Sequence, residues 1–272
     1  MTYASIMVSV DLAGDAGGRI KVATRLAETF EGRTIGVAAQ MPDHAAAQVG
    51  PMGASAVIPG LSRQAVVDGL AWAQDLFRVA VGNRSRVSWR SALKPGLAFL
   101  ASQARAADLI VVGRGDGDEA TGCPLPLDAA SVVLATGRPV LVVPPGIDYL
   151  EGRRVMVAWK DTPEARRAVH DAVPILRLAS RVDVVAVTGA EATSGAADVA
   201  AYLSMHGIRA RSAEHRSEGA GDGETLLDLA SDCTSDLIIM GGYGHSRLRE
   251  LVLGGVTRSV LRHSPICSFL SH

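Results

Sequence analysis

The chain has 272 residues, of which 48% are hydrophobic and 20% charged, with a formal net charge of -1. This length predicts two domains, and the composition excludes a disordered chain. Because no run of five like charges occurs, the sequence does not indicate a nucleic-acid partner. With neither an export signal nor an apolar stretch of about 18 residues, we expect no membrane segment.

Three cysteines are widely spaced along the sequence: Cys123, Cys233 and Cys267. They form no CxxC pair, so we expect neither a zinc site nor a disulfide framework. This pattern favours a reducing, cytoplasmic location. A reactive role for Cys123 has no activating neighbour in the sequence to support it.

Apolar runs alternate with stretches of helical period along the first part of the chain. Strands are predicted at residues 5–11, 33–39, 85–91, 108–113 and 139–144, with helices between them that include 62–81. Residues 41–60 are rich in Ala, Gly and Pro and are predicted to form a long loop. We interpret this loop as a surface insertion, with a flap over a site as the alternative.

The segment 144–154 carries two prolines, two glycines and several charges, which is typical of a link between domains. The predicted domains are therefore residues 1–147 and 152–272. In the second domain, strands are predicted at residues 153–159, 181–188, 208–214, 236–241 and 265–270, and helices at 163–178, 193–206, 222–233 and 255–263. Asp161 or Thr162 is expected to cap the first of these helices, with Pro163 in its first turn.

The two parts of the chain resemble each other. The run DLIVVG at 108–113 matches DLIIMG at 236–241, and IMVSVD, ending at Asp11, matches VMVAWK, ending at Lys160. The chain is thus predicted to be a tandem duplication. Strands alternating with helices predict the α/β class, with parallel sheets covered by helices on both faces.

Glycines cluster after the fourth predicted strand of the second copy, in the segment GGYGHSRLRELVLGGVT at 241–257. Ligands bind beyond the carboxyl ends of parallel strands, where bare backbone N–H groups and the N-terminus of the next helix favour an anion. This position predicts a phosphate site. The structural alternative is that Gly241 and Gly244 permit a tight turn and that Gly254 merely precedes a helix.

The spacing of Gly241, Gly244 and Gly254, with two and then nine residues between them, resembles that of the universal stress protein family. Nucleotide-binding members of that family follow the third glycine with Ser or Thr. Gly255 stands at that position, so a backbone N–H is kept but a side-chain contact is lost. Thr257 matches a threonine that is often found two positions later.

The resemblance implies two tandem flavodoxin-like domains of the adenine nucleotide alpha hydrolase-like type. Each would have a five-stranded parallel sheet with helices on both faces. The resemblance also implies that ATP or another adenine nucleotide, with or without magnesium, lies across the ends of the first and fourth strands.

The candidate binding residues of the second copy are Trp159, Lys160, Gly241, Gly244, His245, Arg247, Gly254, Gly255, Val256 and Thr257. Lys160 stands where the family often has an aspartate, which weakens the case for ribose recognition but favours phosphate. Asp161 is an alternative acceptor. Trp159 either stacks on a base or lies in the core. Arg247 and His245 either contact phosphate or belong to a solvated loop.

The first copy keeps Gly113 but loses the glycine spacing. Acidic residues follow instead: Asp116, Asp118, Glu119 and Asp128. Asp128 aligns with Gly254, and these negative charges would repel a phosphate. We therefore predict that the first copy does not bind a nucleotide and serves as a partner domain. A divalent cation held by Asp116 and Asp118 is the alternative to simple solvation.

The sequence contains neither the GxxxxGK[ST] motif nor GxSxG or HExxH, so no catalytic or metal-binding residue is predicted. The predicted function is a stress-response sensor or switch that binds an adenine nucleotide in its second half. The alternatives are a slow ATP hydrolase using Lys160, His245 or Arg247, and an interaction module without nucleotide. The apolar strands 139–144 and 265–270 are expected to pair within the chain. Further association into a homodimer is left open.

Overall fold

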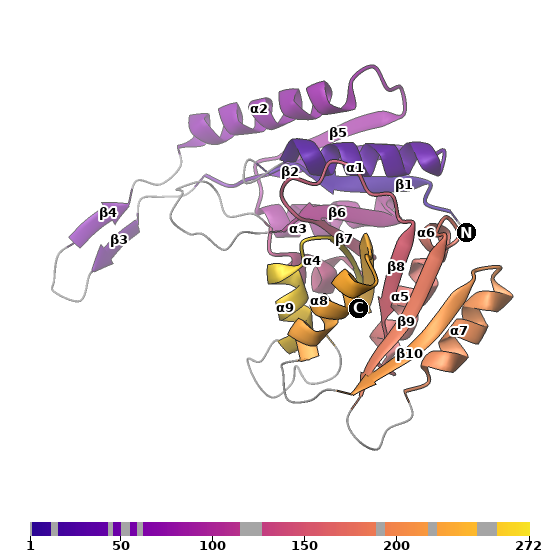
Figure 1. Cartoon of the computed structure of the whole chain (residues 1–272). Helices are drawn as coiled ribbons and strands as arrows, with labels where there is room; N and C mark the ends of the chain where they lie inside the picture. The colour runs from indigo at the N-terminus through magenta and orange to yellow at the C-terminus, as the bar shows by residue number, and fades with distance from the viewer. Residues whose placement is uncertain are drawn as a thin grey trace.

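A single large sheet runs through both halves of the chain (Figure 1). The computed structural model describes residues 2–11, 16–42, 46–49, 55–58, 62–114, 127–188, 194–216, 222–243 and 255–272. Within them, ten strands pair in the order β10-β9-β8-β11-β12-β7-β6-β1-β2-β5. The first half supplies one side of this sheet and the second half the other.

The first half follows the predicted alternation of strands and helices. Its elements are β1 (Ser5–Ser9), α1 (Ala16–Thr29), β2 (Arg33–Ala39), β3 (Ala46–Val49), β4 (Ser55–Ile58), α2 (Arg63–Val81), β5 (Val87–Ala92), α3 (Gly96–Gln103), the short 3-10 helix η1 (Ala104–Ala106), β6 (Leu109–Gly113), α4 (Ala129–Thr136) and β7 (Val140–Val143). Every residue of β6 is buried, as expected of a parallel strand covered on both faces.

The second half repeats this order without the hairpin. Its elements are β8 (Arg154–Ala158), α5 (Pro163–Asp171), α6 (Val173–Leu176), β9 (Arg181–Thr188), α7 (Ala196–Met205), β10 (Ala210–Arg216), α8 (Asp222–Asp232), β11 (Leu237–Gly241), α9 (Gly255–His263) and β12 (Cys267–Ser271). The predicted strands and helices agree with these bounds to within a few residues.

Two predictions are wrong in detail. Instead of a plain loop, the described parts of 41–60 contain an antiparallel hairpin in which Ala46 pairs with Ile58, and Figure 1 shows β3 and β4 projecting away from the sheet. The predicted helix 163–178 is divided into α5 and α6. Pro174 lies in the first turn of α6, and proline has no N–H to continue the hydrogen bonds of a preceding helix.

The strand directions reverse where the halves meet. All strand pairs within each half of this sheet are parallel, whereas β7 and β12 are antiparallel, with Leu141 opposite Phe269. The carboxyl ends of the strands therefore point to opposite edges of the sheet in the two halves. The candidate site of the second half consequently lies on the same edge as the amino ends of the first-half strands.

Helices cover both faces of the sheet, and each face has a core that spans both halves. Residues of α1, α2, α5 and α7 contribute to one core, and residues of α3, α4, α8 and α9 to the other. Over the described parts of the chain, none of the helices is both long and apolar enough to cross a bilayer.

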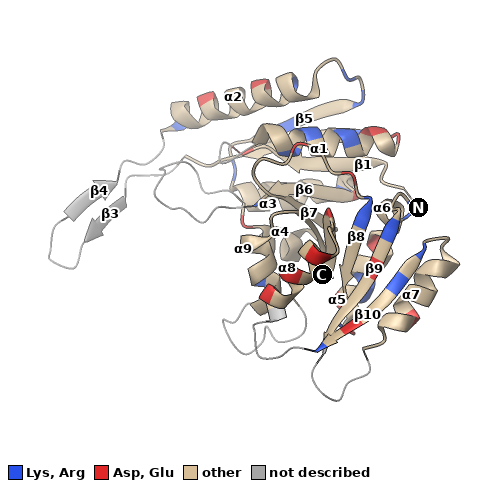
Figure 2. Ribbon diagram, in the orientation of Figure 1, with Lys and Arg blue, Asp and Glu red and all other residues tan. Residues whose placement is uncertain are grey.

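The link between the halves is fixed to α1. Lys21 lies 3.4 Å from Asp148, and the Arg25 guanidinium donates to the Asp148 carbonyl at 3.3 Å and sits 5.1 Å from the Tyr149 ring centre. Figure 2 shows the basic segments of α1 that make these contacts, and acidic and basic residues interspersed over the other elements. The link thus packs onto the first half.

Candidate functional site

The candidate site lies at the carboxyl edge of the second half, where β8 and β11 are neighbours. Ala158 pairs with Met240, so Trp159 and Lys160 follow one strand beside Gly241 at the end of the other. The helix α9 connects β11 to the parallel strand β12, so it runs antiparallel to both strands. Its N-terminus therefore lies at the carboxyl edge of the sheet, where β11 ends. The fold brings together the ends of the first and fourth strands and the start of the last helix.

Trp159 lies in the core at the end of β8. Its side chain is only 7% exposed, and the indole Nε1 donates a hydrogen bond of 2.7 Å to the carbonyl of Ser194. Its backbone N–H donates to the carbonyl of Val185 at 2.7 Å. This environment favours the core interpretation over base stacking, because little of the ring remains accessible.

Lys160 is exposed, and the turn that follows it starts α5. The Lys160 carbonyl accepts a hydrogen bond of 2.7 Å from the N–H of Thr162. Thr162 is the residue that caps the helix, since its side chain accepts from the N–H of Ala165 at 3.3 Å. Asp161 instead pairs with Arg166 at 2.6 Å on the surface. The Asp161 carboxylate is thus already engaged, which weakens its case as a ribose acceptor.

Close packing requires a glycine at 241 and leaves little space beside Gly242. A Cβ at Gly241 would lie 2.5 Å from the backbone nitrogen of Ala165, because the first turn of α5 presses against the end of β11. A Cβ at Gly242 would lie 3.1 Å from Cγ1 of Val133, on α4 of the first half. The sequence suggested a phosphate role or a tight turn, and it gave no signal for these approaches of distant helices.

The start of α9 is open. Gly255 is exposed, and a Cβ at this position would meet nothing within 4 Å among the described residues. Val256 is half-buried and Thr257 is buried, so both face the protein at this first turn. Gly244, His245, Arg247 and Gly254 lie outside the described residues. Among the described residues, nothing therefore lies where a side chain at Gly255 would project.

At the carboxyl edge of the first half, a side chain of the protein fills the space that corresponds to the candidate site. Arg19 of α1 is buried, donates from Nε to the Ser9 carbonyl at 2.8 Å, and forms an ion pair with Asp11. Its guanidinium also occupies the space into which a Cβ at Gly113 would project. The carboxylate of Asp11, which aligns with Lys160, is thus paired within the chain.

The N-terminus of α4 in the first half is likewise occupied by a carboxylate of the chain. Asp128 caps this helix, accepting hydrogen bonds from the N–H and the hydroxyl of Ser131 at 3.0 and 2.7 Å. A carboxylate in this position complements the partial positive charge of the helix terminus. Asp116, Asp118, Glu119 and Cys123 fall outside the described parts of the chain.

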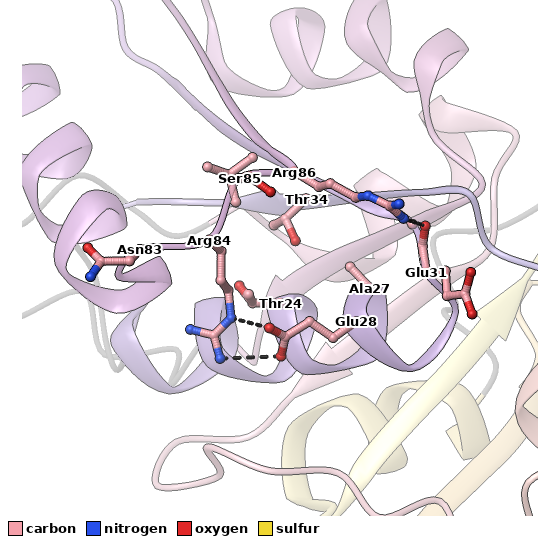
Figure 3. Close-up of a pocket in the computed structure, with 11 residues that line it drawn as sticks. Thr24, Ala27, Glu28, Glu31, Thr34, Asn83, Arg84, Ser85 and Arg86 are labelled. Atoms are coloured by element: carbon pink, nitrogen blue, oxygen red, sulfur yellow. Dashed lines mark hydrogen bonds and ion pairs between the residues drawn. The ribbon is translucent and has the colours of Figure 1, made fainter.

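Sequence analysis did not anticipate a groove of about 390 Å³ at the amino ends of β2 and β5 (Figure 3). Its most prominent contact is a pair of hydrogen bonds, 2.6 and 3.2 Å long, from Arg84 to Glu28. Arg86 in turn donates to the carbonyl of Glu31. These cations contact acceptors of the same groove, so we assign no anion to it.

Comparisons with known proteins agree with this architecture. Residues 152–267 match the Universal stress protein family. Over 43 residues, or 16% of this chain and 15% of the relative, the sequence is 44% identical to universal stress protein Slr1230 of Synechocystis. The match thus spans a small part of that relative's length.

Two solved structures resemble the whole chain. A universal stress protein from Archaeoglobus fulgidus has a TM-score of 0.67 at 14% identity, with 98% of this chain and 95% of that chain covered. A protein of unknown function from Pseudomonas aeruginosa has a TM-score of 0.56 at 15% identity, with 98% and 92% covered. At this identity the likeness shows the fold, an α/β architecture of two similar halves. Residues 152–267 in the second half belong to the universal stress protein family, and the chain as a whole shares its fold with the Archaeoglobus fulgidus member.

Proposed function

We propose that this protein is a stress-response sensor or switch that binds an adenine nucleotide, ATP first among them, at the carboxyl edge of its second half. Three features support the proposal: the family match of residues 152–267, the glycine spacing from Gly241 to Gly254, and the open first turn of α9. Binding would act by changing the state of the protein, without turnover.

The observation that carries the proposal is the space at Gly255. The first N–H groups of a helix have no partner within the helix, and together with the helix dipole they attract anions. Gly255 has no Cβ, and no described residue lies where one would project, which favours access of a phosphate to this side of the first turn. The exposed Lys160, at the end of the neighbouring strand β8, adds a positive charge on this edge. Magnesium would accompany the nucleotide only through its phosphates.

The first half, residues 1–147, is proposed to be a copy without a nucleotide. Two charged side chains of the chain itself support this assignment. The Arg19 guanidinium fills the space over Gly113 and pairs with Asp11, and the Asp128 carboxylate occupies the helix N-terminus where a phosphate would otherwise lie. Both charges would have to move before a nucleotide could bind as proposed for the second half.

We also propose that the two halves function as an intramolecular pair in the cytoplasm. The antiparallel pairing of β7 with β12 supports this arrangement, because it leaves neither of these apolar strands as an open edge. The sheet ends instead on β5 and β10, which are the strands that a homodimer with a continuous sheet would pair.

Mass spectrometry of the ligand released by heat from protein purified without added nucleotide tests the proposal. We expect an adenine nucleotide at a substoichiometric or stoichiometric amount. Phosphate release over hours, measured with added ATP and magnesium, separates binding from hydrolysis. A ligand of another chemical class, retained on the protein after extensive washing, would overturn the assignment.

A further inference from the structure

The turn that follows β11 is held from several sides. The N–H of Gly242 donates to the carbonyl of Ser271 at 2.8 Å, and the carbonyl of Gly242 lies 3.1 Å from Nδ1 of His272. The next residue, Tyr243, is buried and has a φ of 60°, a conformation that non-glycine residues rarely adopt. Such a backbone persists only where the surroundings determine it.

One of these surroundings is the first half of the chain. The wall beside Gly242 is Val133 of α4, whose Cγ1 would be 3.1 Å from a Cβ at that glycine. Val133 is 1% exposed and belongs to the same core as Tyr243 and Leu270. The first half therefore packs directly against the turn at the end of β11, within the candidate site.

A second contact from the first half is linked to Ser271, the residue whose carbonyl accepts the hydrogen bond from Gly242. The hydroxyl of Tyr3 donates to the carbonyl of Asp171 at 2.6 Å, at the C-terminal end of α5. The Asp171 carboxylate accepts a hydrogen bond of 2.9 Å from the hydroxyl of Ser271, whose carbonyl in turn binds Gly242. Tyr3, Asp171, Ser271 and Gly242 thus form one connected chain of contacts from the segment before β1 to the candidate site.

We propose that the first half is a positioning domain for the nucleotide site of the second half. Val133 is the positioning residue: it acts through Gly242 and sets the turn Gly241–Tyr243. The expected effect on nucleotide affinity rests on the proposed function. The effect of Val133 on the turn can be tested without a ligand. It also gives a role to a copy whose own edge is filled by Arg19.

The test compares two valines on the same helix. Val133→Ala removes the Cγ1 methyl group that faces Gly242. Val132→Ala makes the same truncation at a neighbouring position that is 0% exposed but is not among the nearest neighbours of Gly242. Hydrogen exchange of the amides of Gly242 and Tyr243 is measured without nucleotide, with amides of α7 as the internal reference. ATP affinity is measured by calorimetry at a temperature where both variants are folded.

We expect Val133→Ala to speed exchange at the turn by about tenfold and to weaken ATP by a similar factor, as for coupled residues in contact. Val132→Ala should leave both quantities within about twofold of the unmodified protein once its general loss of stability is subtracted. Equal effects of the two substitutions on turn exchange would overturn the inference.

A rescue experiment separates positioning from a general loss of stability. Gly242→Ala brings a methyl group against Val133, and we expect it to weaken ATP by about tenfold. Combining it with Val133→Ala makes room for that methyl group and should restore affinity to within about threefold, while combining it with Val132→Ala should not. Equal restoration by both valine substitutions would contradict the inference.

The two proposals fail in different ways. If the unmodified protein binds no nucleotide, the proposed function fails, while exchange at the turn still decides whether Val133 positions it. If the unmodified protein binds ATP and the two valine variants behave alike, the positioning inference fails alone.

Discussion

Arg19 holds Asp11 in an internal ion pair at the carboxyl edge of the first half, with the Arg19 side chain only 3% exposed. A side chain of the protein thus fills this edge, and its position accounts for a glycine at residue 113. The Arg19 guanidinium needs the space that a Cβ would take.

Removing the Arg19 guanidinium should therefore lower the stability of the fold. We expect Arg19→Ala to lower the free energy of unfolding by about 3 kcal/mol, because it leaves Asp11 without its buried partner. Lys21→Ala, on the same helix, removes an exposed pair with Asp148 and should cost less than about 1 kcal/mol. Urea unfolding followed by circular dichroism gives both values. Similar losses for the two variants would show that the Arg19 pair contributes no more than a surface contact.

A carboxylate placed at Gly255, one position after the residue that aligns with Asp128, should repel a phosphate. We expect Gly255→Asp to weaken ATP by about tenfold or more through charge repulsion, whereas the neutral Gly255→Asn should change affinity by less than about threefold. Neither variant should lower the melting temperature much, because there is room for a side chain and an acidic group suits a helix N-terminus. Calorimetric titration with ATP measures the affinity of both variants. Unchanged affinity of the Asp variant would remove Gly255 from the site.

The hydroxyl of Tyr3 links the halves, and its contribution should depend on pH. Burial, followed by the negative charges of Asp171 and Asp108, raises the pKa of Tyr3 well above 10.0. We expect Tyr3→Phe to lose about 1 to 2 kcal/mol at pH 7, since the carbonyl of Asp171 loses a buried donor.

The sign of the pH effect follows from this raised pKa. Above pH 10, tyrosine ionises in the unfolded chain but not in the folded one, so the stability contributed by the Tyr3 hydroxyl is lost as pH rises further. The difference between the unmodified protein and Tyr3→Phe should therefore shrink between pH 10 and 11 in urea unfolding. The exposed Tyr149, changed to Phe, serves as the control for the loss of a tyrosine hydroxyl at the surface. A constant difference for Tyr3→Phe would contradict the buried hydrogen bond.

The continuous sheet predicts that both halves unfold together. Phe269 of β12 lies opposite Leu141 of β7 and is fully buried, and Phe77 of α2 is buried far from this junction in the first half. Each Phe→Ala change should cost about 3 to 5 kcal/mol and shift one common transition in calorimetry. Two transitions, with each substitution shifting only one of them, would show instead that the halves unfold independently.

Much of the fold follows from local patterns in the sequence. The apolar strands 108–113 and 236–241, separated from their neighbours by stretches of helical period, were sufficient to predict an α/β chain with two copies of one unit. The hairpin of β3 and β4 was missed because its Ala-, Gly- and Pro-rich segment has the composition of a loop. The break between α5 and α6 was missed although Pro174 is a visible signal for it.

The candidate site was less accessible to sequence analysis, because its packing is made by residues far apart in the chain. Nothing local to Gly242 reveals that Val133 lies against it, and nothing near Asp11 shows that Arg19 would fold back over Gly113. The glycine spacing directed attention to the carboxyl edge of the second half. It did not show that Gly241 and Gly242 accommodate helices, or that Gly255 is the position left open.

Titration of the purified protein with ATP, ADP and AMP, with and without magnesium, tests the central claim most directly. We predict saturable heat for one adenine nucleotide per chain, together with a higher melting temperature in its presence. Arg19→Ala should keep this stoichiometry of one, because Asp128 still occupies the helix N-terminus of the first half. Absence of heat and of thermal protection at millimolar ligand would contradict the claim that the second half binds an adenine nucleotide.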